Sequence, residues 1–504
     1  MNIRRIAVSA LMLFSIQLQA REYNILDFGA VKEQLSTSAI QKAVNECFNN
    51  GGGRVVVPAG TFITGTIILK SNVNLYLENG AVLLGSTTID DYKIEGKTLG
   101  MVFAEDACNV GISGLGTIDA SGNSFYDFKL NHIYDEFEKN RTRQKENYMP
   151  EGTFFTDGPV ERTTAPGMTL VFFHCTKVSV TGITIKDTPV WATRFGYCDN
   201  VFIDGVTIRN NLLVPNSDGI HCTASRNIRI SNCDIVAGDD CIVLTGFTFD
   251  EEVPGFKPDE QAAHQYGNKT IYGENMVVTN CILQSSSAGI RIGYGQHPIR
   301  RCSFTNIIIR DSHRGIGIFA HDASNIEDLI FSDFTIETRL LNGQWWGHGE
   351  PIHLSSISRF PGQPSGQIKN VQFNNINAIG EQGILVFGQK ESPMENIQFN
   401  NVQLKMRKGK ETMAYGGNFD LRPASPKSIQ IFEHDIPGIY AQHVNTLSVR
   451  DFNLSWNNDL PAFFTHGIEC LEVKDLLITD FVGNPNPNSP GSKKIMLKNS
   501  AYRK

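Results

Sequence analysis

The sequence predicts an all-β fold, a single-stranded, right-handed parallel β-helix in which short strands stack coil upon coil. Three observations predict this fold. One short motif recurs along the chain, each copy alternates apolar and polar residues with a period of two, and no helical pattern separates the copies. Stacked coils of this kind bury one continuous column of Val, Ile, Leu and Phe side chains.

The motif consists of Asn or a similar polar residue, alternating β-forming residues, a small polar corner and a second apolar run. Its copies begin at Asn200, Asn227, Asn275, Cys302, Asn325, Asn370, Asn396 and Asn445. The shorter separations between them are 23 to 27 residues, and the longer ones, 45 to 49 residues, contain either an extra coil or a long loop. A β-propeller or β-sandwich is the alternative, but a propeller blade needs about 40–45 residues per repeat.

Asparagine suits the corners of such coils for two reasons. It adopts the left-handed backbone conformation more readily than most residues. Its amide can also hydrogen-bond to the Asn at the same corner of the next coil, as in stacked Asn ladders. We therefore expect Asn side chains to pair along the stack.

The N-terminal end of the coils needs a cover, because open strand edges invite pairing with another chain. Residues 36–48 predict a short amphipathic helix for this role, since Ile40, Ala43, Val44 and Cys47 follow an i, i+3, i+4, i+7 pattern. A Ser/Thr pair at its start provides an N-cap. The glycines at 51–53 end the helix before the first strands.

The beginning of the chain predicts export. Arg4 and Arg5 precede an apolar run over residues 6–18 and a small residue, Ala20, which is the layout of a secretory signal peptide. The predicted organisation is a signal peptide at 1–20 and one β-helix domain at 21–504, with a long loop or flap at about 125–166. We expect a periplasmic or secreted protein without membrane insertion, because no later stretch reaches about 18 apolar residues.

The composition limits the classes of partner and cofactor that we expect. The chain has 45 Lys and Arg against 52 Asp and Glu, so nothing favours a nucleic-acid partner. Its ten cysteines form no CxxC pairs, which argues against a zinc site. Disulfides in an exported protein and stacked free thiols, as at Cys233 and Cys281, both stay open. We expect a monomer that uses no metal and no cofactor.

Two adjacent carboxylates, Asp239 and Asp240, interrupt an apolar strand pattern over residues 235–244. Burial of an unpaired charge costs several kcal/mol, so the pair needs a compensating reason. Asp218 precedes the pair by 21 and 22 residues, which is close to one coil, so the three acids are expected to converge on the outer wall. The flanking Gly219 and Gly238 allow close backbone approach and unusual backbone angles.

Converging carboxylates are what glycoside hydrolysis requires. One carboxyl group is held protonated and donates to the leaving oxygen, while another is ionised and activates water or attacks. Crowding supplies the split, because like charges raise one pKa and leave the neighbouring groups ionised. A calcium site or solvated corner acids are the alternative interpretations of the same residues.

The chain resembles glycoside hydrolase family 28, the polygalacturonases and rhamnogalacturonan hydrolases, over most of its length. The resemblance lies in residues 23–30, 39–43 and 51–62, and it is most specific at Asn216-Ser-Asp-Gly and Gly238-Asp-Asp-Cys, which match the family's Asn-Thr-Asp-Gly and Gly-Asp-Asp motifs. It implies a pectin-lyase-like solenoid that cleaves α-glycosidic bonds of galacturonan or rhamnogalacturonan with inversion. Asp239 would be the general acid, Asp218 and Asp240 would activate water, and Asn216 would contact substrate.

Two departures from the family pattern concern the substrate. Ala288 stands where the family has the His of Gly-Gly-His-Gly, and Gly317 and Phe319 stand where it has the Arg and Lys of Arg-Ile-Lys. An Arg and Lys pair binds a sugar carboxylate through charge-assisted hydrogen bonds. Its loss favours a branched or mixed pectin and leaves a neutral α-galactoside as an alternative substrate.

Several other residues are candidates for contacting the substrate in place of the missing motifs. They are Arg291, His313, Arg314 and His321, together with Trp345 and Trp346 in a Gly-rich loop. Indole faces stack on sugar rings, which is the reason for including the two tryptophans. The flap could close one end of the cleft and make the enzyme exo-acting.

Two rival functions use the same scaffold. A pectate-lyase-like enzyme would need a calcium cluster and an Arg or Lys base, and its products would absorb in the ultraviolet. A non-catalytic, tailspike-like carbohydrate-binding β-helix would show no turnover at all. Substitution of Asp239 by Asn distinguishes a binder from a hydrolase, because only the hydrolase has a rate to lose.

Overall fold

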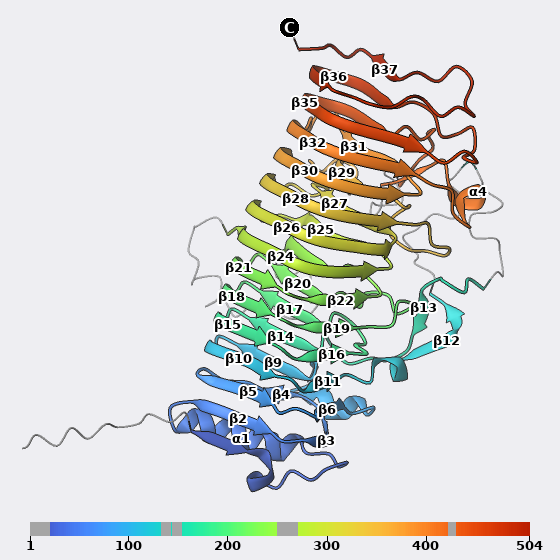
Figure 1. Cartoon of the computed structure of the whole chain (residues 1–504). Coiled ribbons are helices and arrows are strands. Elements are labelled where there is room, and N and C mark those ends of the chain that lie inside the picture. The colour runs from blue at the N-terminus through green and yellow to red at the C-terminus, as the bar shows by residue number, and fades with distance from the viewer. Residues whose placement is uncertain (1–20, 133–142, 144–153, 249–270, 422–429, 504) are drawn as a thin grey trace, which may run out of the picture.

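The computed structural model describes residues 21–132, 143, 154–248, 271–421 and 430–503 of the 504-residue chain. One sheet of 31 strands winds through these ranges as a stack of coils from the N-terminal to the C-terminal end (Figure 1). Strands of successive coils pair in parallel. The predicted parallel β-helix is therefore confirmed. The predicted signal peptide, residues 1–20, lies outside the described residues and stays a prediction.

The strands of the coils form three walls. The first wall contains β4 (Ile67–Ile68), β9 (Val102–Glu105), β14 (Leu170–Phe173), β17 (Thr193–Gly196), β20 (Ile220–Thr223), β23 (Ile242–Gly246), β25 (Ala288–Gly295), β27 (Arg314–Phe319), β29 (Ile352–Ser356) and β31 (Ile384–Gly388). The second contains β1 (Glu22–Asn24), β2 (Gly53–Val57), β5 (Val73–Leu77), β10 (Cys108–Gly114), β15 (Thr176–Thr181), β18 (Asp199–Asp204) and β21 (Arg226–Ser231). The third contains β3 (Gly60–Thr64), β6 (Ala81–Gly85), β11 (Thr117–Asp119), β16 (Thr184–Lys186), β19 (Thr207–Arg209) and β22 (Asp234–Ala237).

Later coils merge the second and third walls into single bent strands. These are β24 (Gly273–Ser285), β26 (Ile299–Ser312), β28 (Ile326–Thr338), β30 (Ile368–Gly380) and β32 (Glu395–Met406). The last coils contain β35 (Ile439–Trp456), β36 (Ile468–Thr479) and β37 (Ile495–Lys498). β24 pairs with both β21 and β22, which marks the coil where the merger begins.

The three long separations between motif copies each correspond to one coil with a long connection. The strands on either side of each separation are direct hydrogen-bonded neighbours, which excludes an extra coil. The pairs are Arg226 with Glu274, Ile326 with Ile368, and Ile397 with Leu447.

Asparagine pairs run along the corners, as expected. Asn275 donates to Asn227 at 2.9 Å and Asn396 donates to Asn370 at 2.9 Å, and all four residues have positive φ between 54° and 58°. A second ladder follows the bend of the merged strands, where Asn401 donates to the amide oxygen one coil below at 3.0 Å. Each pair satisfies amide groups at a corner that few other residues adopt without strain.

The interior is a continuous apolar column. Side chains of successive coils stack directly, as in Phe304, Phe331, Phe373 and Phe399, whose ring centroids are 4.7, 5.1 and 5.0 Å apart. All four rings are fully buried. All ten cysteines lie in the described part and are free, and all but Cys108 are buried. The stacked-thiol interpretation therefore describes this structure.

The predicted lid forms α1 (Thr37–Asn49), which packs against the first strands at the N-terminal end of the stack (Figure 1). Its apolar face, Ala39, Ile40, Ala43, Val44 and Cys47, is buried. The cap differs from expectation, because the Ser36 hydroxyl donates to backbone carbonyls of the preceding turn at 3.1 Å and makes no side-chain cap bond to the helix.

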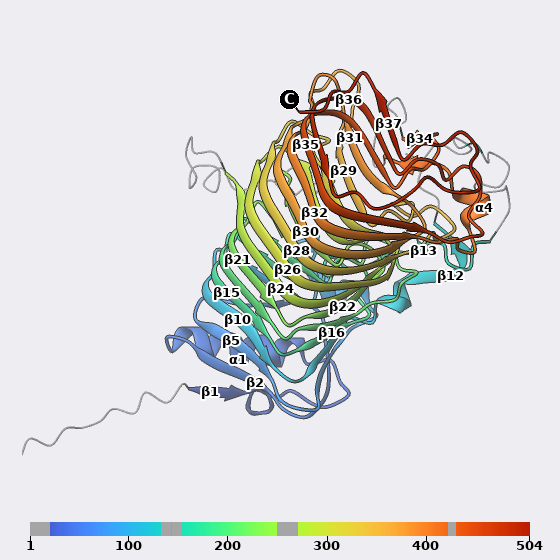
Figure 2. The same ribbon diagram turned by 45° about the horizontal axis from the view of Figure 1, so that its top comes forward.

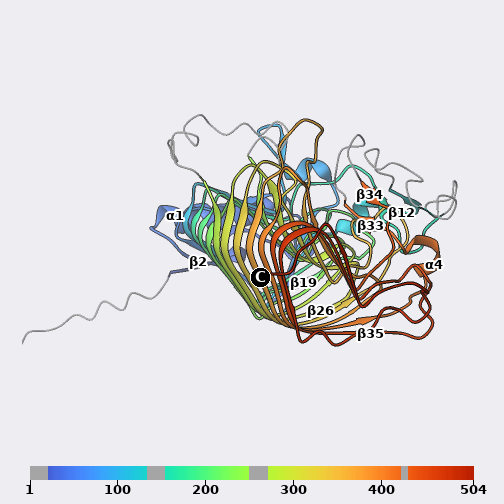
Figure 3. The same cartoon turned by 90° about the horizontal axis from the view of Figure 1, so that it is seen from above.

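Small elements outside the coils gather on one side of the stack. The flap contributes an antiparallel pair, β12 (Tyr126–Asn131) and β13 (Val160–Arg162), and its residues 133–142 and 144–153 lie outside the described residues. A second pair, β33 (Phe419–Asp420) and β34 (Ile431–Phe432), and the short α4 (Thr412–Tyr415) lie on the same side (Figures 2 and 3). Three 3-10 helices (Ile25–Phe28, Ile89–Tyr92, Gly122–Phe125) and a hairpin of β7 (Lys93–Ile94) and β8 (Lys97–Thr98) complete the described elements.

Within the described ranges, none of the helices has the length and apolar character that crossing a membrane requires.

Candidate active site

The three acids lie at the turns that lead into the first wall. Asp218 precedes β20, and Asp239 and Asp240 precede β23. The backbone N–H of Gly219 donates to the carbonyl of Asp240 at 2.9 Å, so Asp218 and Asp240 belong to adjacent coils. Ala288 follows one coil later, since Cys241 donates to its carbonyl at 3.0 Å. The spacing of about one coil in the sequence has therefore become a spatial stack.

Tight backbone packing shapes these turns. A Cβ on Gly238 would lie 2.1 Å from the Val214 carbonyl oxygen, and one on Gly219 would lie 2.5 Å from the Cys241 carbonyl oxygen. Close approach was expected at both glycines, but unusual backbone angles were also expected, and neither glycine has a positive φ. Asn216 is the residue in the left-handed region, with φ of 54°.

All three acids are nearly inaccessible. Asp218 is 1% exposed, Asp239 5% and Asp240 3%. Buried carboxylates need partners, and the partners differ among the three.

Arg291 lies across two of the acids. Its Nε donates to Asp240 Oδ2, and its Nη2 lies 3.7 Å from Asp218 Oδ2. The backbone N–H of Ala288 donates to the other oxygen of Asp240 at 2.9 Å. Burial opposes the charge of Arg291, but the two carboxylates outweigh burial and raise the pKa of the guanidinium. Arg291 and a main-chain donor thus surround Asp240 at the coil where the family has histidine.

Asp218 has a second partner, His221. The Nδ1 of His221 lies 3.0 Å from Asp218 Oδ2, and its Nε2 lies 3.4 Å from the Thr245 hydroxyl. The indole of Trp191, one coil earlier, stacks on the imidazole with ring centroids 3.6 Å apart. Burial has the largest effect and raises the pKa of Asp218 above its ordinary value, although the contact with His221 lowers it in part.

Asp239 has no direct ion pair among the described residues. Asn216 donates to its Oδ2 at 3.4 Å, a long hydrogen bond. Burial raises the pKa of the Asp239 carboxyl well above its usual range, and the charges of Asp218 and Asp240 raise it further. Burial therefore favours the protonated form of Asp239.

The positions of the family's Arg and Lys are filled differently here. Phe319 lies over Gly317, where a Cβ would be only 2.6 Å from the ring. The Phe319 ring stacks on Tyr294 at 5.5 Å between centroids and is buried. A longer side chain at 317 would have to displace this ring, so the wall beyond the acids is aromatic where the family pattern is cationic.

Most other predicted substrate contacts are closed to solvent. His313, Arg314, His321 and Trp345 are each at most 2% exposed. The Trp345 indole N–H donates to the carbonyl of Asp157 at 2.5 Å, and His321 Nε2 lies 2.6 Å from the Ser355 hydroxyl. All four side chains are thus buried, and their role in binding sugar stays a prediction.

Three predicted contacts have partial exposure. Arg291 has 12% of its side chain exposed, although the acids occupy its charge. Asn216 and Trp346 are half-buried. Asn216 lies beside Asp239, and Trp346 lies in the loop before β29.

The structure adds three residues that the sequence interpretation missed: Trp191, His221 and Arg162. Trp191 stands 27 residues, about one coil, before Asp218, so coil spacing could have indicated it. His221 lies in β20, three residues after Asp218. Arg162 comes from β13 of the flap, and its Nη2 donates to Asn216 Oδ1 at 3.0 Å. No repeat spacing predicts Arg162, because the flap lies outside the repeat.

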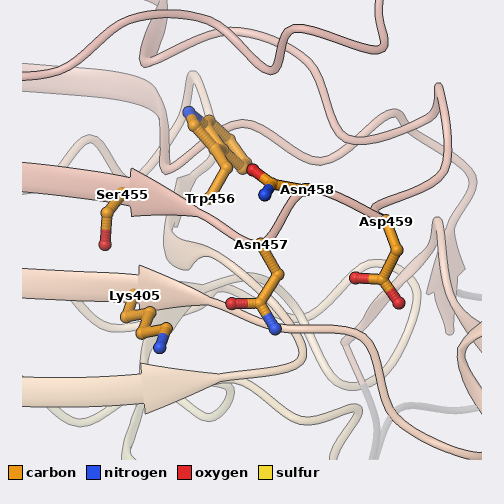
Figure 4. A pocket seen from close by; sticks show the side chains of 6 residues that line it. All are labelled: Lys405, Ser455, Trp456, Asn457, Asn458 and Asp459. Atoms are coloured by element: carbon orange, nitrogen blue, oxygen red, sulfur yellow. The ribbon is translucent and has the colours of Figure 1, made fainter.

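Among the described residues, no group of three or more His, Cys, Asp or Glu side chains is arranged to hold a metal ion. A shallow pocket of about 590 Å³ lies elsewhere, at the ends of β32 and β35 (Figure 4). It is lined by Lys405, Ser455, Trp456, Asn457, Asn458 and Asp459. With one carboxylate, this pocket lacks the pair that hydrolysis requires.

Comparison with known proteins agrees with the geometry of the acids. The model of the glycosyl hydrolases family 28 matches residues 47–322, more than half of the chain, and this range includes the three acids and Arg291.

Individual relatives are distant. A probable polygalacturonase from Vitis vinifera is 28% identical over 257 residues, which cover 47% of this chain and 47% of the relative, so the match spans about half that protein's length. An endo-polygalacturonase from Pectobacterium carotovorum subsp. carotovorum is 24% identical over 370 residues, 67% of this chain and 87% of the relative. The family 28 exopolygalacturonase of Yersinia enterocolitica superposes with a TM-score of 0.61 at 17% identity, covering 96% of this chain and 78% of that one, which shows a shared fold.

Proposed function

The chain belongs to glycosyl hydrolase family 28, and from this membership we propose that it hydrolyses α-glycosidic bonds of a pectic polysaccharide with inversion of the anomeric carbon. The observation that carries the proposal is the unequal pairing of the three acids. Arg291 contacts Asp218 and Asp240, whereas Asp239 has no cation in direct contact among the described residues. One carboxyl group is thus suited to hold a proton and two are suited to stay ionised.

Asp239 acts as the general acid. Its raised pKa keeps it protonated at a pH where free carboxyl groups are ionised, so it can donate to the glycosidic oxygen as the bond breaks. Asn216, 3.4 Å from its Oδ2, orients the carboxyl group. After the sugar leaves, Asp239 is ionised and recovers a proton from solvent.

Asp218 and Asp240 activate the attacking water. Arg291 contacts both carboxylates, and the main-chain N–H of Ala288 donates to Asp240 at 2.9 Å. Water placed between these carboxylates loses a proton to one of them as its oxygen attacks the anomeric carbon from the face opposite the leaving group. His221 holds Asp218 in place through its Nδ1 contact at 3.0 Å.

The substrate we propose is a mixed pectin of the rhamnogalacturonan type. Gly317 and the buried Phe319 stand where an Arg and Lys pair would bind a second galacturonate, so this pair of cations is absent. A rhamnose ring carries a methyl group where galacturonate carries a carboxylate, so it needs no cation at this position. A neutral α-galactoside, without any carboxylate, is the second candidate that the same observation supports.

We further propose exo action, because the flap contacts loops of distant coils. The Asp157 carbonyl accepts from Trp345, and the Asp157 N–H donates to Asn342 Oδ1 at 3.3 Å. Arg143 contacts Asp435 at 2.6 Å. These contacts support a barrier at the C-terminal side of the acids, which would admit a chain end and exclude its interior.

Export to the periplasm or the medium is part of the proposal. Its support is the signal-peptide pattern of residues 1–20. N-terminal sequencing of the protein from a culture tests it. A mature chain that begins at Arg21 is expected, and a chain that retains Met1 would contradict export by this signal.

A product profile tests the activity. The purified protein is incubated with polygalacturonan, rhamnogalacturonan and α-galactosides, and the anomer of the new reducing end is followed by NMR. We expect the inverted anomer from a pectic substrate and mono- or disaccharide products from the start. A retained anomer would contradict the mechanism, ultraviolet-absorbing products would indicate a lyase, and an early ladder of oligosaccharides would contradict exo action.

A further inference from the structure

Arg162 places a positive charge beside the proposed general acid. It is the last residue of β13, it is half-buried, and its Nη2 donates to Asn216 Oδ1 at 3.0 Å. The other end of the Asn216 amide donates to Asp239 Oδ2 at 3.4 Å. One amide group therefore separates the guanidinium from the carboxyl group that protonates the leaving oxygen.

Arg162, Arg291 and Arg314 differ in what neutralises them. Arg291 contacts Asp240 and Asp218, and Arg314 lies 3.5 Å from Glu350 and 3.7 Å from Asp420. Among the described residues, Arg162 makes no ion pair with a carboxylate, and its partner Asn216 is neutral. Arg162 thus carries the charge that an acidic substrate can use.

The charges of the site require such a group if the substrate is acidic. With Asp239 protonated, Asp218 and Asp240 present two negative charges against the positive charge of Arg291, which contacts both. A sugar carboxylate that approached this group alone would be repelled. A guanidinium on the other side of Asp239 balances the remaining negative charge and offers a planar pair of donors for a carboxylate.

The base of the flap holds Arg162 in position. β12 and β13 pair with each other on one side of the coil stack, where Tyr126 pairs with Arg162 (Figure 1). The Tyr126 hydroxyl donates to the Pro189 carbonyl at 2.6 Å, and Asn131 donates to the Phe155 carbonyl at 3.0 Å. A guanidinium has five N–H donors, and the bond to Asn216 uses one of them.

We propose that Arg162 is a specificity-determining residue that binds the carboxylate of a galacturonate ring next to the scissile bond. The proposal rests on the proposed hydrolysis of pectic polysaccharide and names its substrate class as uronate-bearing. It also assigns a binding role to the flap, because Arg162 is a flap residue.

Calorimetric binding tests this role without turnover. Trigalacturonate and its fully methyl-esterified form are titrated into the Asp239→Asn protein with and without a second substitution, Arg162→Gln. Loss of a charge-assisted contact is expected to weaken trigalacturonate binding about 10- to 100-fold. The affinity for the neutral ester should change by less than about threefold. Arg162→Lys in place of Arg162→Gln should restore part of the affinity for trigalacturonate.

The matched control is Asn131→Ala, which loosens the same hairpin without changing its charge. Asn131→Ala should weaken the binding of both ligands equally or leave both affinities unchanged. If Arg162→Gln also weakens both ligands equally, or leaves trigalacturonate binding unchanged, the proposal is overturned. The hydrolase assignment fails separately, by the absence of new reducing ends when the wild-type protein is given pectic substrates, and the binding comparison remains valid in that case.

Discussion

Two buried clusters on the first wall have the same core and different chemistry. In each, one arginine lies between two carboxylates: Arg291 between Asp240 and Asp218, and Arg314 between Glu350 and Asp420. A guanidinium shared by two acids is thus a stabilising unit of this wall. The unit alone does not make an active site.

The Arg291 cluster differs from the Arg314 cluster in two ways: it has a third acid, and it is partly exposed to solvent. Asp239 adds an unpaired carboxyl group to the Arg291 cluster, which keeps some exposure. In the Arg314 cluster the carboxylates accept from loop backbone, since Gly347 donates to Asp420 at 2.6 Å and His348 donates to Glu350 at 2.7 Å. The Arg314 cluster therefore fixes the loop before β29. The Arg291 cluster differs because its third carboxyl group adds negative charge that no cation among the described residues contacts, and this excess favours a proton on Asp239.

Removal of the third acid, Asp239, is the strongest test of the difference between the two clusters. Asp239→Asn should lower the rate of hydrolysis by about 10²–10⁴-fold, because a general acid contributes that much to proton transfer. Initial rates on the preferred substrate measure it, with thermal unfolding as the control for a native fold. Retention of more than about a tenth of the wild-type rate would contradict the role of Asp239.

A substitution in the Arg314 cluster should lower the stability of the protein. Arg314→Met leaves Glu350 and Asp420 buried without their cation, and breaking a buried pair costs about 3–5 kcal/mol. Denaturant unfolding measures the loss of free energy of unfolding. Arg314→Lys is the control that keeps the charge, and a stable Arg314→Met protein with normal unfolding would show that the loop does not depend on this cluster.

Removal of Arg291 should shift the pH dependence of catalysis. Arg291 lowers the pKa of Asp218 and of Asp239, so Arg291→Gln should move both limbs of the kcat/KM profile to higher pH. The shift is read from initial rates across the pH range, and Arg291→Lys should retain most of the wild-type profile. Limbs that stay in place, or move to lower pH, would contradict the electrostatic role of Arg291.

The smallest effect expected is on stability against pH. The folded-state pKa of Asp239 is raised, so its favourable contribution is present below the unfolded pKa of about 3.9 and is lost as pH rises through the folded value. Asp239→Asn should remove this decline. Unfolding free energies measured at a series of pH values test it, and parallel curves for the two proteins would exclude a raised pKa at Asp239.

The fold could be predicted from local sequence patterns. A corner Asn with alternating apolar residues defines a coil wherever it occurs, because left-handed φ and amide pairing are properties of the residue itself. The acids were readable for the same reason: Asp218 and Asp240 recur at one coil's spacing, and a parallel stack converts that spacing into contact, as the bond from Gly219 to Asp240 shows.

Burial and long-range contact could not be read in this way. His313, Arg314, His321 and Trp345 have the chemistry of sugar-binding residues, yet the loops that cover them make them part of the interior. Loop packing depends on contacts between segments with no common period, such as Trp345 with Asp157. The sequence offered no measure of which polar side chains these loops would enclose.

The repeat therefore specified the coils and the stack of acids, because both follow from a periodic backbone that places equivalent positions one above the other. Which arginine neutralises which acid was decided only in three dimensions. Arg291 contacts Asp240 from the next coil, and Arg162 reaches Asn216 from a flap 54 positions earlier in the chain. Electrostatic pairing depends on distance in space, and outside the repeat the order of residues does not set that distance.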